Sequence, residues 1–323
     1  MGRMKTFMLM AAMTALLMVV GQYAGGNAGM MMAFLMAGGM NFFAYWNSDK
    51  MVLRKTNAQE VDAITAPTLY RMIQDLSQNA DLPMPKVYVI SSPQPNAFAT
   101  GRDPQHAAIA VNTGLMDILS QDELAGVISH ELAHIKNRDT LTMTVTATMA
   151  GALTMVARWA MFMGGNNRDS RGGGALGAIL SIFLAPMAAA LIQFAVSRAR
   201  EYEADKHGAW ICGNPLWLAG ALEKLGIGAQ RIRNPNAERY PETASLYIVN
   251  PLAAKGDKLF STHPSLENRI ERLREMAEAE PNVQTYQVNE QNQMRQASQQ
   301  TQRAKVKSDP KDFTAPGNDN PWK

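Results

Sequence analysis

The sequence has little cysteine and little net charge. Cys212 is the only cysteine among 323 residues, so the chain has no intrachain disulfide and cannot build a thiolate-rich zinc finger. A lone cysteine suits a reducing compartment, where it most often serves as a small core residue. The formal charge is only +3, which gives no overall basic bias and argues against a nucleic-acid partner.

Apolar residues are concentrated in a few long stretches. A bilayer-spanning helix needs about 20 predominantly apolar residues. Four stretches reach about that length: 7–24, 28–46, 142–163 and 175–196. The first is not followed by a convincing cleavage site, and a second stretch comes almost at once, so we interpret them as a hairpin rather than a signal peptide. We therefore expect an integral membrane protein with four transmembrane helices in two hairpins, 1–46 and 140–196.

The basic residues near these stretches predict the orientation. Cytoplasmic flanks are enriched in lysine and arginine. Such residues precede the first and third stretches and follow the second and fourth, whereas the link 25–28 has none. The flanking basic residues are Arg3, Lys5, Lys50, Arg54, Lys55, Lys136, Arg138, Arg198 and Arg200. We expect a multi-pass protein of the cytoplasmic (inner) membrane, with both termini facing the cytoplasm.

The rest of the chain predicts a mostly α-helical domain with a small β-sheet, in two halves, 47–139 and 197–280. Hydrophobic periodicity predicts helices over 60–80, 121–138, 197–212, 216–225 and 264–278, and strands or extended segments over 85–91, 96–101 and 107–112. The tail, 281–323, is polar and rich in glutamine and asparagine, which predicts disorder.

The run His130-Glu131-Leu132-Ala133-His134 is the most informative motif. Positions i and i+4 share a helix face, so both imidazoles can bind one metal ion, with Glu131 placed to reach a water on it. Ser120 and Glu123 form a possible capping box ahead of this helix. The pattern is typical of a zinc hydrolase, although an ordinary amphipathic helix can contain it by chance.

A two-histidine site needs at least one more protein ligand. The second hairpin returns the chain to the same membrane surface just before Glu201 and Asp205, which are also spaced i and i+4. One carboxylate can bind the metal and the other can hold a histidine ligand through a hydrogen bond. Glu203 faces away from this pair, and His207 is a rival ligand.

Together these motifs resemble the HtpX-type membrane zinc metallopeptidases, relatives of the CAAX-prenyl proteases. The resemblance covers about residues 1–278. It rests on the histidine motif with its continuation to Asp139, on Glu201-Tyr202-Glu203-Ala204-Asp205, on the run 261–270 with its Thr-His-Pro and Arg-Ile elements, and on Asn96 to Gly101.

The resemblance implies a zincin-like cytoplasmic catalytic domain with one Zn²⁺ per chain. His130, His134 and Glu201 would bind the metal, Glu131 would be the catalytic base, and Asp205 would support a histidine ligand. The protein would be an endopeptidase that cleaves damaged or misfolded membrane proteins. It would contact the lipid bilayer and could cleave itself.

Two further roles follow from the same resemblance. The segment of Asn96, Ala97, Phe98 and Ala99 would line the substrate cleft and pair with an extended peptide. His263 would polarise the scissile carbonyl or its oxyanion, or else would cap the final helix.

Other functions are compatible with parts of the pattern. A CAAX-prenyl processing protease shares the metal motifs but has more membrane spans. A non-catalytic scaffold with a zinc site has no need of a base at Glu131. A transporter should carry several charges within its spans, yet only Arg158 lies within one.

Overall fold

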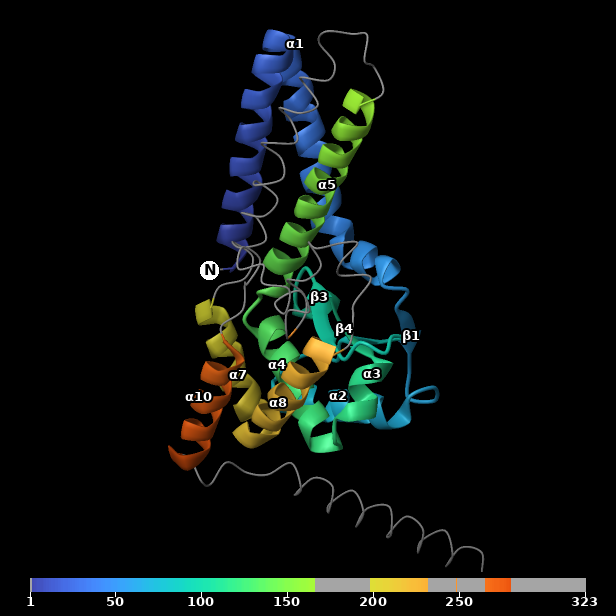
Figure 1. The fold of residues 1–323 in the computed structure, drawn as a ribbon, viewed down its shortest axis with the longest axis vertical. Coiled ribbons are helices and arrows are strands. Elements are labelled where there is room, and N and C mark those ends of the chain that lie inside the picture. Colours follow the sequence, from blue (N-terminus) through green and yellow to red (C-terminus); the bar gives the residue numbers. More distant parts are fainter. Residues whose placement is uncertain (1, 166–197, 232–247, 249–264, 280–323) are drawn as a thin grey trace, which may run out of the picture. The chain divides into compact units, whose positions relative to one another are not determined.

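The computed structural model describes residues 2–165, 198–231, 248 and 265–279, all within one compact unit of the chain. Helices predominate in these residues, and four strands form one mixed sheet (Figure 1). This confirms the mostly α class with a small sheet. The polar tail lies outside the described residues.

The helix α1 (Gly2–Lys55) is a pair of helices joined at a glycine turn. The backbone at Gly26 has a φ of +59°, a region that glycine adopts without steric cost. The two arms pack closely, because a Cβ added at Gly21 would lie 2.5 Å from the carbonyl oxygen of Gly29. The first predicted hairpin is therefore a pair of helices, and its second arm continues past Trp46 to Lys55.

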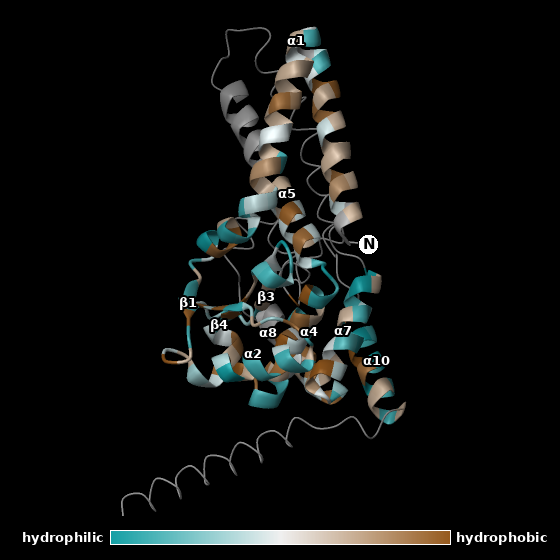
Figure 2. Cartoon of the chain, turned by 180° about the vertical axis from the view of Figure 1, so that it is seen from behind, coloured by the Kyte–Doolittle hydropathy of each residue, from teal (hydrophilic) through white to brown (hydrophobic). Residues whose placement is uncertain are grey.

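Both arms of α1 are long and apolar enough to cross a bilayer, over Thr6–Tyr23 and Gly25–Lys55. Only 22% and 17% of these windows are buried, unlike the core helix of a soluble protein. Figure 2 shows apolar residues along both arms. Large exposed apolar side chains on them include Phe7, Met8, Leu16, Val19, Met31, Met32, Phe34, Leu35, Met36, Phe42 and Phe43.

The helix α5 (Thr140–Gly165) covers the third predicted span. Its first half packs against the first arm of α1, where the hydroxyls of Thr142 and Thr6 are 2.8 Å apart. In the part of the chain that the structure describes, only the arms of α1 meet the length and hydropathy of a span. The fourth predicted span lies outside that part.

The sheet has the strand order β1-β2-β4-β3, with β1 (Gln59–Val61), β2 (Lys86–Ile90), β4 (Ala107–Asn112) and β3 (Ala97–Gly101). β2 and β4 are parallel, and the outer pairs are antiparallel. The strands expected at 85–91, 96–101 and 107–112 are confirmed. β3 is an edge strand.

The prediction of a helix over 60–80 is wrong at its start. The first residues form β1, and α2 (Pro67–Asn79) begins at a proline, which favours the first turn of a helix. Between them the Asp62 carboxylate accepts hydrogen bonds from the backbone N–H groups of Ile64 and Thr65, at 2.9 and 2.8 Å. This side-chain turn competes with helix formation.

The helix α4 (Gln121–Lys136) lies at the centre of the domain, in contact with α2, β3, α7 (Arg198–Cys212) and α8 (Pro215–Arg231). α10 (Leu266–Ala279) packs on α8 and α7. These four helices were expected. The short elements η1 (Pro104–His106) and α3 (Thr113–Ile118) were not.

Candidate metal centre

The start of α4 is fixed by the expected capping box. The Ser120 N–H donates to the Glu123 carboxylate at 2.7 Å, and the Glu123 N–H donates to the Ser120 hydroxyl at 3.2 Å. Every residue from Leu124 to Ile135 is buried. The two histidines therefore lie on a helix that is enclosed by protein on all sides, which excludes the interpretation of solvent-facing histidines on an amphipathic helix.

The helix α7 lies against the backbone of α4 at the first histidine. A Cβ added at Gly208 would lie 2.9 Å from the Cα of His130, so only glycine permits this backbone contact. Glu201, two turns earlier on α7, is brought to the same site and is buried. The proximity that the hairpin topology predicted for Glu201 is confirmed.

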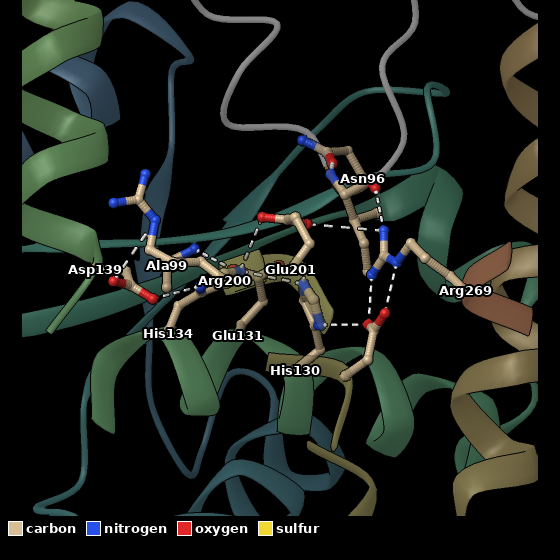
Figure 3. A network of polar contacts seen from close by, with 11 residues as sticks. Asn96, Ala99, His130, Glu131, His134, Asp139, Arg200, Glu201 and Arg269 are labelled. Carbon is tan, nitrogen blue, oxygen red and sulfur yellow. Dashed lines mark hydrogen bonds and ion pairs between the residues drawn. The ribbon is translucent and has the colours of Figure 1, made fainter. Parts of the chain in front are cut away.

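Three potential ligand atoms converge in Figure 3. The Nε2 atoms of His130 and His134 are 3.2 Å apart. The carboxylate oxygens of Glu201 lie 3.8 Å from the first Nε2 and 3.6 Å from the second. Ligands about 2.0–2.1 Å from a tetrahedral ion lie about 3.3 Å apart, so the three donors fit one such ion with small adjustments.

A carboxylate holds each imidazole from behind. The Nδ1 of His130 is 3.0 Å from the Asp205 carboxylate, and the Nδ1 of His134 is 3.4 Å from the Asp139 carboxylate. A carboxylate beside Nδ1 favours the tautomer with the proton on Nδ1, which leaves Nε2 free to bind a metal. Asp205 therefore lies where it was expected, whereas the role of Asp139 was not predicted.

Arg269 belongs to the Arg-Ile element noted in the sequence, but its role at the site was not predicted. Its guanidinium, 1% exposed, donates to both oxygens of Asp205 at 2.8 and 2.6 Å, and to the backbone oxygen of Ile248 at 3.1 Å. It also lies 3.8 Å from Glu201. The available signal was its spacing four residues before Leu273, which places it on the buried face of α10.

Glu131 points to the sheet rather than into solvent. Its Oε2 accepts a hydrogen bond of 2.8 Å from the backbone N–H of Ala99. Burial raises the pKa of Glu131 to about 7, although the nearby His134 and the bond from Ala99 favour the ionised form. A carboxyl with a pKa near neutrality can both take and return a proton.

The two histidines differ in their electrostatic surroundings. Burial lowers the pKa of His130 despite its contact with Asp205. Burial acts in the same direction on His134, but Asp139, Glu201 and Glu131 outweigh it and raise its pKa to about 9. Asp205 is also buried, yet Arg269 holds its pKa below the usual range. The site thus concentrates negative charge that a cation would balance.

The free edge of β3 faces the metal centre. The backbone N–H of Asn112 donates to the backbone oxygen of Asn96 at 2.9 Å. In an antiparallel pair, hydrogen-bonded and non-hydrogen-bonded residues alternate along each strand, so the backbone groups of Ala97 and Ala99 point away from β4. The bond from Ala99 to Glu131 shows this directly. The Phe98 side chain instead belongs to a buried apolar cluster that includes Val52 and Leu53 of α1.

Asn96 holds another segment of the chain. Its side-chain oxygen accepts a hydrogen bond of 3.3 Å from the Ile248 N–H. The carbonyl of Ile248 binds Arg269, so the start of β3 and the metal centre are linked through one residue.

The remaining histidines lie apart from the described ligands. His106 pairs with Asp103 at 2.7 Å and is half exposed, and His207 lies 3.2 Å from the side-chain oxygen of Asn137 at the end of α4. Glu203 is exposed, as its spacing predicted. His263 lies outside the described residues.

Comparison with known proteins places these observations in a family. The fold is similar to that in the crystal structure of S. mikatae Ste24p, with a TM-score of 0.47 and 19% sequence identity, covering 84% of this chain and 65% of that one. The chain thus spans less than two thirds of the length of that protein. The family model of Peptidase family M48 matches residues 63–277, more than half of the chain and all the described site residues. The chain belongs to peptidase family M48, a family of metallopeptidases, as its motifs predicted.

Proposed function

We propose that this chain is a zinc-dependent endopeptidase of a membrane, and that it hydrolyses peptide bonds of membrane-attached or unfolded polypeptides. The observation that carries the proposal is the convergence of His130, His134 and Glu201, with Glu131 beside them. Two imidazoles and one carboxylate suit zinc, and when bound the ion would polarise a carbonyl and lower the pKa of a coordinated water to about 7.

The protein's own residues supply substrate binding and proton transfer. The backbone groups of Ala97 and the carbonyl of Ala99 point away from β4 and can pair with an extended peptide, which adds a strand to the sheet. Glu131 lies against that edge, so it can take a proton from the attacking water and pass it to the leaving amine. Asp205 and Asp139 hold the imidazoles in the tautomer that binds metal. His263 is the candidate for stabilising the oxyanion.

We further propose the predicted four-span topology, with the metal-binding domain assembled from 47–139 and 197–280 around the second hairpin, 140–196. The exposed apolar surface of α1 supports the first hairpin. The basic residues that flank the stretches support a cytoplasmic site in the inner membrane. On this basis the substrates are damaged membrane proteins or unfolded chains near the surface, including copies of the protein itself.

The test is zinc content and proteolysis of the full-length protein purified in detergent. An unfolded protein serves as substrate, with chelation, zinc add-back and a Glu131→Gln variant. We expect about one zinc per chain, and cleavage that is lost on chelation, restored by zinc and absent in the variant. Zinc-loaded wild-type protein that cleaves nothing would contradict the proposal and favour the scaffold.

A further inference from the structure

The end of the apolar part of α1 lies against the turn that follows the edge strand. The guanidinium of Arg102, directly after β3, lies 4.8 Å from the ring centroid of Trp46. Arg102 also has an ion-pair contact of 3.6 Å with Asp103. Tryptophan beside a cation at the end of a membrane span is typical of the headgroup layer. This contact therefore places the β3–β4 turn at the bilayer surface.

The residues next to Trp46 also indicate that the bilayer surface lies at this position on α1. Trp46 is 44% exposed, and the ring of Tyr45 lies against it at 5.4 Å between centroids. Beyond Trp46, the exposed residues on α1 become basic, with Lys50 and Arg54. The aromatic residues followed by cations mark the passage from hydrocarbon to headgroups.

A second contact shows the direction of β3 relative to the bilayer. Leu53, seven residues after Trp46, and Phe98, four residues before Arg102, belong to one buried apolar cluster where α1 and β3 are in contact. A helix rises about 1.5 Å per residue and a strand about 3.3 Å. The segment from Trp46 to Leu53 on α1 therefore spans about 10 Å, and the segment from Phe98 to Arg102 spans about 13 Å. The two elements thus run side by side in opposite directions, and β3 approaches the bilayer as its residue numbers rise.

The base reaches β3 at a defined point on this path. Glu131 binds the N–H of Ala99, three residues from Arg102, and three extended residues span about 10 Å. A peptide paired with the edge of β3 is therefore held with its reacting bond about 10 Å from the headgroup layer.

We propose that β3 acts as a ruler, so that the enzyme selects the juxtamembrane segments of membrane-anchored polypeptides and cuts them about three residues from the end of a span where the segment is extended, and about seven where it is helical. This inference rests on the proposed peptidase function and adds its substrate class. The Arg102–Trp46 contact marks the bilayer surface from which the distance is measured, and the Ala99–Glu131 contact marks the position of the bond that is cut.

The test uses full-length enzyme in bilayer vesicles with a designed substrate. The substrate carries one transmembrane helix followed by a 30-residue linker of a short repeat, chosen among sequences that the enzyme cuts in an unfolded protein. Mass spectrometry maps the cuts. Tethering alone would reduce cutting about fivefold between residues 5 and 15, because local concentration falls roughly as the −3/2 power of length. We expect a maximum at about three to seven residues and a decline well above tenfold by residue 15.

A matched pair of variants tests the role of the Arg102–Trp46 contact. Arg102→Gln weakens the contact with Trp46 and should spread the cuts along the linker. Arg71→Gln, an exposed arginine on α2, should leave their distribution as in the wild type. Cuts spread evenly over the linker by the wild-type enzyme, or a smooth decline of about fivefold, would overturn the ruler.

The linker without its transmembrane helix separates this inference from the function on which it rests. If the free linker is cut at every repeat while the anchored one shows no preferred distance, the peptidase proposal stands and the ruler fails. If neither is cut, although the same sequence was cut within an unfolded protein, the ruler also fails. If no substrate of any kind is cut, the peptidase proposal itself fails.

Discussion

Arg269 of α10 and Asp205 of α7 form a two-pronged ion pair that is closed to solvent, with N–O distances of 2.8 and 2.6 Å. The Oδ1 of Asp205 that accepts from the Nη2 of Arg269 also lies 3.0 Å from the Nδ1 of His130. A residue from the last described helix thus acts on a candidate metal ligand of α4 through a single carboxylate. Because the guanidinium also lies 3.8 Å from Glu201, it influences two of the three candidate ligands.

Replacement of Arg269 by methionine should weaken the metal site and the fold. It leaves Asp205 buried without its partner, and breaking a buried pair in this way typically costs about 3–5 kcal/mol. We expect a 10- to 100-fold loss of zinc affinity, as for other groups that support ligands. Zinc competition with a chromogenic chelator measures it. Arg274→Met, at an exposed arginine of the same helix that pairs with Glu223 of α8, is the control, and equal affinities in the two variants would contradict the role.

The carboxylates of Asp139 and Asp205, which contact the Nδ1 atoms of the two histidines, should both contribute to zinc affinity. Asp139→Asn and Asp205→Asn each remove the negative charge that lies against the Nδ1 of a candidate ligand, so each should reduce zinc affinity about 10- to 100-fold. The loss should be larger for Asp205→Asn, because its contact with the imidazole is shorter and it also pairs with Arg269. Glu203→Gln on the exposed side of α7 should bind zinc like the wild type. An unchanged affinity in Asp139→Asn would exclude its role at His134.

The pH dependence of stability should report on Glu131 in the metal-free protein. Folding raises its pKa from an ordinary 4.5 to about 7. A carboxyl of this kind stabilises the fold only while protonated, so its contribution is complete below about pH 4.5 and is lost as the pH rises through 7. Glu131→Gln should match the wild type at low pH and exceed it by roughly 3 kcal/mol at pH 8.

Thermal unfolding in detergent with a chelator, from pH 5 to 8, tests this expectation. The difference in melting temperature between variant and wild type should grow steadily with pH. A constant difference over this range would show that Glu131 has an ordinary pKa in the folded protein.

The local parts of the site could be predicted from the sequence because each rests on short-range spacing. Ser120 and Glu123 are three residues apart, and His130 and His134 are four apart, so helix geometry alone sets their relation. The position of Glu201 needed one further step, the return of the second hairpin to the same surface.

The long-range parts could not be predicted in the same way. Arg269 and Asp205 are 64 residues apart, and an arginine among the charges of α10 has the pattern of a solvated helix. The bond from Ala99 to Glu131 depends on which edge of β3 is free, which is a property of strand order rather than of spacing. The start of α2 was missed because the turn at Asp62 competes with a helix that periodicity alone would extend.

The contact of α7 with α4 at Gly208 should be needed for metal binding. A methyl group there would lie 2.9 Å from the Cα and N of His130, and backbone atoms of two packed helices cannot yield cheaply. Gly208→Ala should therefore push Glu201 away from the histidines and reduce zinc affinity at least about tenfold, although alanine favours a helix by about 1 kcal/mol. Gly220→Ala on α8 is the matched control, since its methyl would meet only the flexible end of Glu123 at 3.2 Å. We expect the control to bind zinc as the wild type does. Full affinity in Gly208→Ala would mean that α7 can move without carrying its ligand away, and that the close contact at His130 does not set the geometry of the site.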